Sequence, residues 1–535
     1  MTTRAYHSPE RKASATAGLE RELKFVADPK AFDAALALPL LGGPTVESSR
    51  RLESVYFDTG DDDFARAGVA LRVRREDGAF IQGLKRAAGS DRGMFERDEQ
   101  EVESPSAEPD LALFGAESAR DLAEILGGKV LKAKFGSDVR RTTRTVQVGG
   151  AAVEVALDSG FLFAGERREP LREIELELKS GPPAALFAYG LQAIEALPLR
   201  LCVESKAERA RRLRSHEAPA LVRAQPPSLT PETPLDEAIG ALLRNCLSQF
   251  LGNLPALGSG DSVEAVHQMR VAMRRLRSAL GLFNRAFPCA EFEYLRAESR
   301  RIAAVLGEAR DWDVFVEMLR VGPLPRFADE PGFDSLLSAA QAKANGGHAA
   351  VVRLCGDKAT TRFALVLERI AAERGWRNAA ADDRLRQLEE PVAGFAARSL
   401  DRLDRKVRKR GRHFAALTPA ARHALRIALK HVRYATEFFG GLFHPASAAE
   451  LYARKAAALQ DMLGELNDAA IALRLIKELD TRASPDFAYA AGVAAGWCGR
   501  ASVGDQEALA KAWRSLVKAE RHWRSEAAER KRELD

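Results

Sequence analysis

Charged side chains alternate with aliphatic ones along several short segments of the first 215 residues. Glu20, Glu22 and Lys24 occupy every second position of one segment, and Glu173 and Glu175 do so in another. Successive side chains of a β-strand point to opposite faces, so these charges would share one face of each strand. One such strand is typical of a solvated sheet face. A series of them predicts a closed barrel with a charged interior.

The chemistry of such an interior follows from its two kinds of side chain. Crowded carboxylates repel one another unless cations lie between them, and hard oxygen ligands suit Mg²⁺ or Mn²⁺. Interleaved lysine and arginine side chains would bind a polyanion by charge-assisted hydrogen bonds. Together these groups meet the needs of phosphoryl transfer: metal ions on phosphate oxygens, cations on the remaining oxygens, and a positioned water.

Two later segments carry basic side chains at the spacing 0, +3, +7 and +10. The first holds His267, Arg270, Arg274 and Arg277, and the second holds His423, Arg426, Lys430 and Arg433. At about 100° per residue, these offsets fall within an arc of roughly 80°, so each set forms one stripe along a helix. Either stripe alone could be a solvated helix face.

The second part of the chain also repeats itself. LGEARDWD (Leu306–Asp313) begins 39 residues after the first histidine, and LGELNDA (Leu463–Ala469) begins 40 residues after the second. Matching motifs in the same order indicate duplication. We therefore expect two pseudo-symmetric helical bundles whose stripes face each other across a groove that attracts a polyanion. The basic segment Asp401–His413 would add further cations.

A proline-rich stretch separates these two patterns. Residues 218–234 contain five prolines, which favour an extended linker. We expect an α+β multidomain protein with a β-domain at 18–215, a linker at 216–234 and an all-α domain at 235–525. The helical repeats would span about 235–390 and 391–525.

Composition excludes several classes of protein. With 46% hydrophobic residues, the chain can form real cores, which argues against wholesale disorder. The net charge of +6 conceals an uneven distribution, since residues 1–217 hold 33 basic and 36 acidic side chains and residues 218–535 hold 48 and 39. The five scattered cysteines and the absence of an apolar leader predict a cytoplasmic protein. No P-loop, HExxH or GxSxG motif is present.

Residues 18–213 resemble the CYTH family, the triphosphate tunnel enzymes. The matching segments are LERELK (Leu19–Lys24), VYFDT (Val55–Thr59), LRVR (Leu71–Arg74), GLK (Gly83–Lys85), RDE (Arg97–Glu99), VALD (Val155–Asp158), EIE (Glu173–Glu175) and SKAER (Ser205–Arg209). The resemblance implies an eight-stranded antiparallel tunnel that binds a linear triphosphate. Two positions depart from the family pattern: Gly83 stands where threonine is common, and Ala210 where glycine is common.

The same resemblance implies roles for individual residues. It places the metal ligands at Glu20, Glu22, Glu99, Asp158, Glu173 and Glu175. It places the triphosphate contacts at Lys24, Arg72, Arg74, Lys85, Arg97, Arg141 and Lys206. It places the catalytic residues at Glu20, Glu22, Lys24 and Lys85. The first expectation is Mg²⁺- or Mn²⁺-dependent hydrolysis of inorganic triphosphate to diphosphate and phosphate, ahead of class IV-type adenylate cyclase and thiamine triphosphatase activities.

Residues 235–523 resemble the CHAD domain, a helical module that binds inorganic polyphosphate. The resemblance rests on Val266–Arg277, Leu306–Val314, His423–Glu437 and Leu463–Asp468. It implies that the two stripes bind polyphosphate and that the protein associates with polyphosphate granules. With little aromatic interleaving, we expect no sequence-specific nucleic-acid binding, and we expect no membrane association. A non-catalytic polyphosphate-binding scaffold is the competing class.

Overall fold

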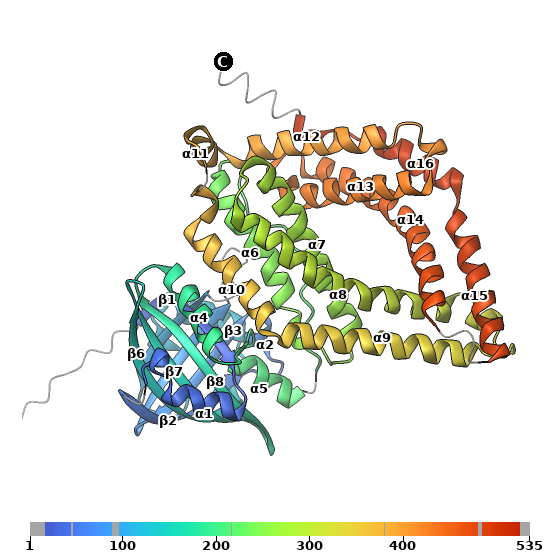
Figure 1. The fold of residues 1–535 in the computed structure, drawn as a ribbon. Helices are drawn as coiled ribbons and strands as arrows, with labels where there is room; N and C mark the ends of the chain where they lie inside the picture. The colour runs from blue at the N-terminus through green and yellow to red at the C-terminus, as the bar shows by residue number, and fades with distance from the viewer. Residues whose placement is uncertain are drawn as a thin grey trace, which may run out of the picture. The chain divides into compact units, whose positions relative to one another are not determined.

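The computed structural model describes residues 16–43, 46–87, 96–215, 217–378, 380–479 and 484–524 (Figure 1). The chain forms two compact units that divide after Ala218, and each unit is described by itself. Among the described helices, none is both long enough and apolar enough to cross a bilayer.

The first unit is built on a closed antiparallel barrel. Its eight strands are β1 (Thr16–Val26), β2 (Ser48–Asp58), β3 (Val69–Glu76), β4 (Ala79–Ala87), β5 (Glu96–Ser104), β6 (Lys132–Val148), β7 (Ala151–Ala164) and β8 (Arg167–Ser180). They follow the order β5-β4-β3-β2-β6-β7-β8-β1, and pairing of β1 with β5 closes the ring. The two-residue strand β9 (Arg200–Leu201) lies beside β1. The prediction of an eight-stranded antiparallel barrel is confirmed.

The aliphatic face of the strands packs outward. Leu23, Phe25 and Ile174 are fully buried, and the helices α1 (Pro29–Ala37) and α4 (Pro183–Ala196) pack on β1, β7 and β8 from outside. The helices α2 (Asp63–Arg66) and α3 (Ala116–Leu126) contribute side chains to a second apolar core on the outer face of the strands. Because the outer face takes the apolar residues, period-2 alternation leaves the charged residues to line the interior.

The short helix α5 (Lys206–Ser215) packs on the inner face of the barrel. Its Ala207 and Ala210 are buried against Leu52, Tyr56 and Val139. These barrel residues lie on the same face as the interior charges, because their register partners are Glu76, Arg72 and Leu52. An apolar plug therefore fills this part of the interior. Ala210 is fully buried within it, which explains why a small residue is required there.

The second unit is all-helical and repeats itself. Its helices are α6 (Leu235–Leu251), α7 (Ser262–Ala286), α8 (Ala290–Val321), α9 (Phe333–Gly356), α10 (Lys358–Glu373), α11 (Asp382–Glu389), α12 (Val392–Arg410), α13 (Pro419–Phe439), α14 (Ala446–Glu478), α15 (Pro485–Val503) and α16 (Gln506–Val517). The series α6–α9 and α12–α15 pack in the same order, and α7, α8 and α9 contact α13, α14 and α15 respectively (Figure 1). The all-α architecture is confirmed.

The two repeats begin at equivalent points. The segments before α6 and α12 form an antiparallel bridge in which Pro234 lies opposite Pro391. The amide of Leu235 donates to the carbonyl of Glu390 at 2.9 Å, and the amide of Val392 donates to that of Thr233 at 2.8 Å. This reciprocal pairing joins the first turns of both repeats and fixes them relative to each other.

Candidate functional site

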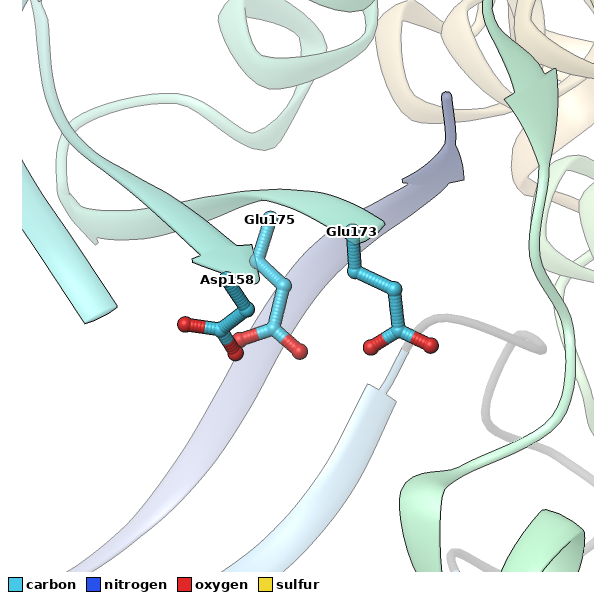
Figure 2. A group of neighbouring side chains, drawn as sticks. All are labelled: Asp158, Glu173 and Glu175. Carbon is cyan, nitrogen blue, oxygen red and sulfur yellow. The ribbon is translucent and has the colours of Figure 1, made fainter. Parts of the chain in front are cut away.

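Three carboxylates meet inside the barrel. Asp158 on β7 lies opposite Glu173 on β8, and Glu175 follows on the same face of β8 (Figure 2). All three are buried, and one oxygen from each lies within 4.8 Å of the others. This tricarboxylate cluster is formed by the VALD and EIE segments, because the β7–β8 register brings them level.

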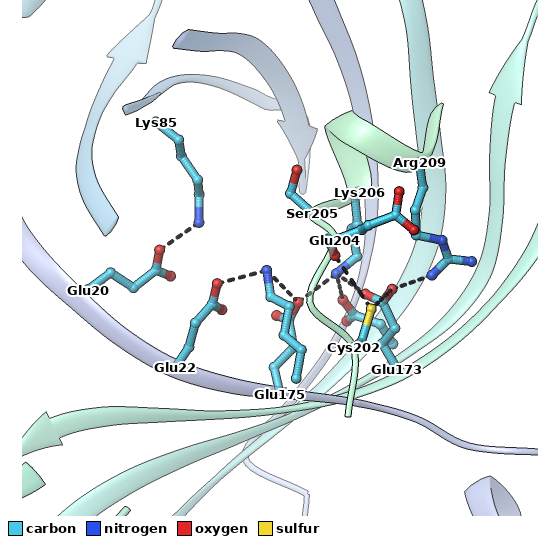
Figure 3. Close-up of polar contacts among 12 residues, drawn as sticks. Glu20, Glu22, Lys85, Glu173, Glu175, Cys202, Glu204, Ser205, Lys206 and Arg209 are labelled. Carbon is cyan, nitrogen blue, oxygen red and sulfur yellow. Dashed lines mark hydrogen bonds and ion pairs between the residues drawn. The ribbon is translucent and has the colours of Figure 1, made fainter. Parts of the chain in front are cut away.

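Two cations hold the tricarboxylate cluster together. The ammonium of Lys206, at the start of α5, lies 2.9 Å from Asp158, 2.8 Å from Glu173 and 2.7 Å from Glu175 (Figure 3). The guanidinium of Arg141 donates to Asp158 at 2.8 and 2.7 Å and also pairs with Glu175. Burial acts to raise the pKa of Glu175, but Lys206, Arg141 and Lys24 hold that pKa well below its usual value. The carboxylate is therefore ionised and available as a ligand.

The two glutamates of β1 lie in the same interior but are paired with lysines. Lys24 contacts Glu22 at 2.7 Å and Glu175 at 3.5 Å, so it links β1 to the tricarboxylate cluster. Lys85 contacts Glu20 at 2.7 Å and Glu99 at 3.0 Å. The structure thus brings the predicted metal ligands into one interior: three converge within 4.8 Å, and the other three are each paired with Lys24 or Lys85.

Two of the predicted arginines, both on β3, pair with the glutamates of β5. Arg72 donates to Glu99 at 3.1 Å and to Glu101 at 2.6 Å, and Arg74 pairs with Glu101 at 3.4 Å. Burial acts to raise the pKa of Glu101, but these two arginines lower it to about 2. Burial and the nearby charge of Arg97 act to lower the pKa of Lys24, but Glu22 and Glu175 raise it above its usual value. Cations and carboxylates therefore alternate around the interior.

Gly83 has a specific packing role here. A Cβ at this position would lie 3.0 Å from Nε and 3.3 Å from Cγ of Arg72. The glycine therefore lets the Arg72 side chain cross β4 to reach the glutamates of β5. The departure from threonine at this position is explained by the space that Arg72 occupies.

Sequence reasoning missed two residues of this network. Glu101 is absent from the predicted site residues, although it pairs with both predicted arginines of β3. Arg209, the last residue of SKAER, pairs with Glu173 and Glu169, both at 2.5 Å. Its place within the matched motif was the available signal, since one helical turn places it on the same side of α5 as Lys206.

The donor set suits a hard divalent cation. Three buried carboxylates offer converging oxygens, and Mg²⁺ and Mn²⁺ prefer such ligands. Glu20 and Glu22 could supply further oxygens if their lysines turned toward a bound anion. Asp158, Glu173 and Glu175 would therefore hold the ion.

The basic stripes of the helical unit converge on a second site. Burial and the charges of Arg274, Arg426 and Arg270 lower the pKa of Lys430 to about 7, although the charge of Asp468 acts to raise it. These cations come from both α7 and α13, so the two stripes face each other. Arg274 and Arg433 both approach the ring of Tyr434, with guanidinium-to-centroid distances of 5.6 and 5.0 Å. We call Arg270, Arg274, Arg426, Lys430 and Arg433 the central cation cluster.

Two glycines give this site its symmetry. Arg270 donates to the carbonyl of Gly307 at 3.2 Å and to Asp311 at 3.0 Å. In the second repeat, a Cβ on Gly464 would lie 3.5 Å from the Arg426 guanidinium. Each LGE motif thus provides a side-chain-free surface on which the arginine of its repeat lies. The spacing of the motifs was visible in the sequence, but this role of their glycines was not.

The remaining predicted members of the stripes lie at the margins. His267 is half-buried beside Arg270 and Arg274, and burial with the charge of Arg310 lowers its pKa. His423 is exposed, and its Nδ1 lies 3.1 Å from the Asn467 side chain. Arg277 is exposed near Arg296 and Arg300 of α8, apart from the central cation cluster. Its angle around α7 differs by only about 20° from that of Arg270, so its position about two turns further along the helix, beside α8, separates it from the cluster.

Two domain families match the chain. The CYTH domain matches residues 18–210, and the CHAD domain matches residues 241–477. An inorganic triphosphatase of Haemophilus influenzae is 32% identical over 152 residues, which are 28% of this chain and 40% of that protein. An uncharacterized protein of Mycobacterium tuberculosis is 26% identical over 275 residues, 50% of this chain and 52% of that protein. The matches thus span about half or less of these curated relatives.

Solved structures similar to each part are also known. The CHAD domain of Ricinus communis is 32% identical, with 56% of this chain and 98% of that chain covered and a TM-score of 0.48. A putative adenylyl cyclase from Hippeastrum, described as having a dominant triphosphatase activity, is 20% identical, with 36% of this chain and 96% of that chain covered and a TM-score of 0.28.

Proposed function

Because the chain belongs to the CYTH family over residues 18–210 and to the CHAD family over residues 241–477, we propose that its barrel hydrolyses inorganic triphosphate and its helical unit binds inorganic polyphosphate. Similarity to an inorganic triphosphatase supports a phosphoryl-transfer or hydrolase role for the barrel. The observation that carries the proposal is the tricarboxylate cluster, set among Lys24, Arg141 and Lys206.

Each side chain of the interior has a role in this proposal. CYTH triphosphatases are metal-dependent, and a divalent ion held by the tricarboxylate cluster would supply charge neutralisation on phosphate oxygens. Arg72, Arg74 and Lys85 bind and orient the triphosphate through charge-assisted hydrogen bonds. Without the anion, each of these cations is paired with a glutamate. The triphosphate would replace the glutamates as the partner of these cations. The carboxylates released from these pairs can accept hydrogen bonds from the attacking water.

Metal removal is the test of the hydrolase. The full-length protein should release phosphate from triphosphate with Mg²⁺ or Mn²⁺, and a chelator should reduce the rate at least about a thousandfold, because several kcal/mol of transition-state stabilisation would be lost. Added metal should restore the rate. Parallel assays with ATP and thiamine triphosphate separate the alternatives, since cyclic nucleotide formed from ATP would favour the cyclase. Metal-independent binding without phosphate release would favour the scaffold.

The helical unit supports a second function because its cations face one another. Central cation cluster residues from both repeats lie close enough to lower one another's pKa values. A long phosphate chain would bring the missing negative charge and bind in a salt-dependent manner. Cytoplasmic location and association with polyphosphate granules are further predictions of this proposal.

Lys430 predicts a pH dependence of polyphosphate binding. Its pKa of about 7 reflects burial, the nearby Arg274, Arg426 and Arg270, and the opposing Asp468. A bound anion raises the pKa of Lys430. Above pH 7, binding therefore protonates the Lys430 amine, whereas below pH 6 the amine is already protonated before binding. Affinity should fall about tenfold from pH 6 to pH 8.

The Lys430→Arg variant should lose this pH dependence, because arginine stays protonated throughout the range. Titration of the full-length protein with long polyphosphate checks this, since only the ends of a long chain titrate. Lys477→Arg, on an exposed turn of α14, is the matched control and should behave as the wild type. A Lys430→Arg curve that still falls with pH would contradict the assignment.

A further inference from the structure

A third row of cations lies on α12. Arg402, Lys406 and Arg410 are spaced at i, i+4 and i+8, so they share one face of the helix. We call them the outer stripe. Two arginines on other faces of this helix are neutralised: Arg405 pairs with Asp401 at 3.0 Å, and Arg408 pairs with Asp404 at 2.7 Å.

The outer stripe itself has no such carboxylate. Among the described residues, Arg402 and Lys406 form no ion pair, and Arg410 donates to the carbonyl of Ala424 at 2.7 Å. Arg285 of α7 lies close enough to lower the pKa values of both Arg402 and Lys406, after burial as the main cause. Packing uncompensated like charges together destabilises a folded protein. An anion bound along the stripe would remove this repulsion.

His431 on α13 joins the outer stripe to the central cation cluster. Its Nδ1 lies 2.8 Å from the Ser278 hydroxyl of α7. After burial, the charges that lower its pKa to about 4 are Lys406, Arg277, Lys430 and Arg410. These four cations come from α12, α7 and α13 itself. Lys430 of the central cation cluster and Lys406 and Arg410 of the outer stripe therefore both lie near the neutral imidazole, where α12 packs on α13.

We propose that the central cation cluster and the outer stripe form one continuous track, along which a phosphate chain passes across His431 onto Arg402, Lys406 and Arg410. The proposal rests on polyphosphate binding by the helical unit and adds a basis for chain-length preference. Arg277 gains a role in this track, because it lies beside His431 rather than in the central cluster.

The chemistry of the stripe favours polyphosphate over nucleic acid. Binding of single-stranded nucleic acid depends on exposed aromatic side chains that stack on bases. Residues 401–413 contain no phenylalanine, tyrosine or tryptophan. A row of cations at one side of a helix, about 6 Å apart along its axis, requires only a flexible anion with closely spaced charges.

A triple variant tests the track in the full-length protein. Arg402→Gln, Lys406→Gln and Arg410→Gln are combined, and binding is measured with a graded series of polyphosphate lengths in the presence of a chelator. In the wild type, affinity should keep rising with length after the central cluster is filled. In the variant, it should level off at a shorter length, with long chains bound about 10- to 100-fold more weakly and with a smaller salt dependence.

The control removes three charges elsewhere. Arg301, Arg369 and Arg454 are each paired with a glutamate on their own helix, and replacing all three by glutamine should leave the length series unchanged. Failure of the wild type to bind any chain would overturn the proposed polyphosphate function. Normal binding of short chains with an unchanged length series in the triple variant would overturn the track alone. Equal loss for short and long chains would also overturn it. Displacement of polyphosphate from the outer stripe by an equally charged single-stranded oligonucleotide would identify nucleic acid as the occupant.

Discussion

Glu175→Gln should reduce the rate of triphosphate hydrolysis at least about a thousandfold, which corresponds to roughly 4 kcal/mol of lost transition-state stabilisation. The substitution keeps the size of the side chain but removes the charge of a carboxylate that contacts Arg141, Lys206 and Lys24. A metal ion in the tricarboxylate cluster would lose one of its three anionic ligands. Three cations would also remain around a neutral amide and repel the incoming metal.

Metal affinity provides an independent measurement of this effect. Mn²⁺ binding to the full-length protein, followed by paramagnetic resonance, should weaken strongly in Glu175→Gln. Glu53→Gln is the matched control, because Glu53 lies on the outer face of β2, where it pairs with Arg75 and Arg51. This control should retain both hydrolysis and Mn²⁺ binding. If Glu175→Gln kept full activity, the tricarboxylate cluster would not be the metal site, and the hydrolase proposal would need another centre.

The barrel could be predicted because its physical signal is local. Glu22 and Lys24 alternate with Leu23 and Phe25, which the structure buries under the outer helices. Alternation indicates which side chains share a face, but not which of them meet across strands. That depends on register, and the β7–β8 register is what places Asp158 opposite Glu173. The separation of the tricarboxylate cluster from the lysine-paired Glu20, Glu22 and Glu99 was therefore invisible in the sequence.

The sequence also did not reveal contacts between elements that are far apart along the chain. Lys206 reaches the tricarboxylate cluster because α5 packs against the apolar inner face of the barrel. Neither the position of this helix nor its apolar contacts follow from the SKAER segment itself. In the helical unit, the spacing placed Arg277 in one stripe with Arg274, and in the structure the charges nearest to Arg277 are those of Arg300 and Arg296 on α8. Spacing along one helix does not show which side chains of other helices lie nearby, because that depends on tertiary packing.

Neutralising four of the five members of the central cation cluster should weaken polyphosphate binding severely without unfolding the protein. Combining Arg270→Gln, Arg274→Gln, Arg426→Gln and Lys430→Gln should weaken the binding of long chains at least about a thousandfold. Burial and the charges of neighbouring cluster members lower the pKa values of Arg274, Arg426 and Lys430, so the protonated forms of these three side chains are disfavoured in the cluster. Removing them therefore relieves repulsion, and the melting temperature of the variant should stay the same or rise.

This combination of outcomes separates a lost binding site from a lost fold. A misfolded variant would lose binding and melt at a lower temperature, whereas the facing-stripe arrangement predicts lost binding with retained or increased stability. The matched control neutralises Arg301, Arg369, Arg405 and Arg454, which have carboxylate partners. Its binding should decrease only slightly, because the same net charge is removed outside the site. Undiminished binding by the central variant would show that polyphosphate binds elsewhere.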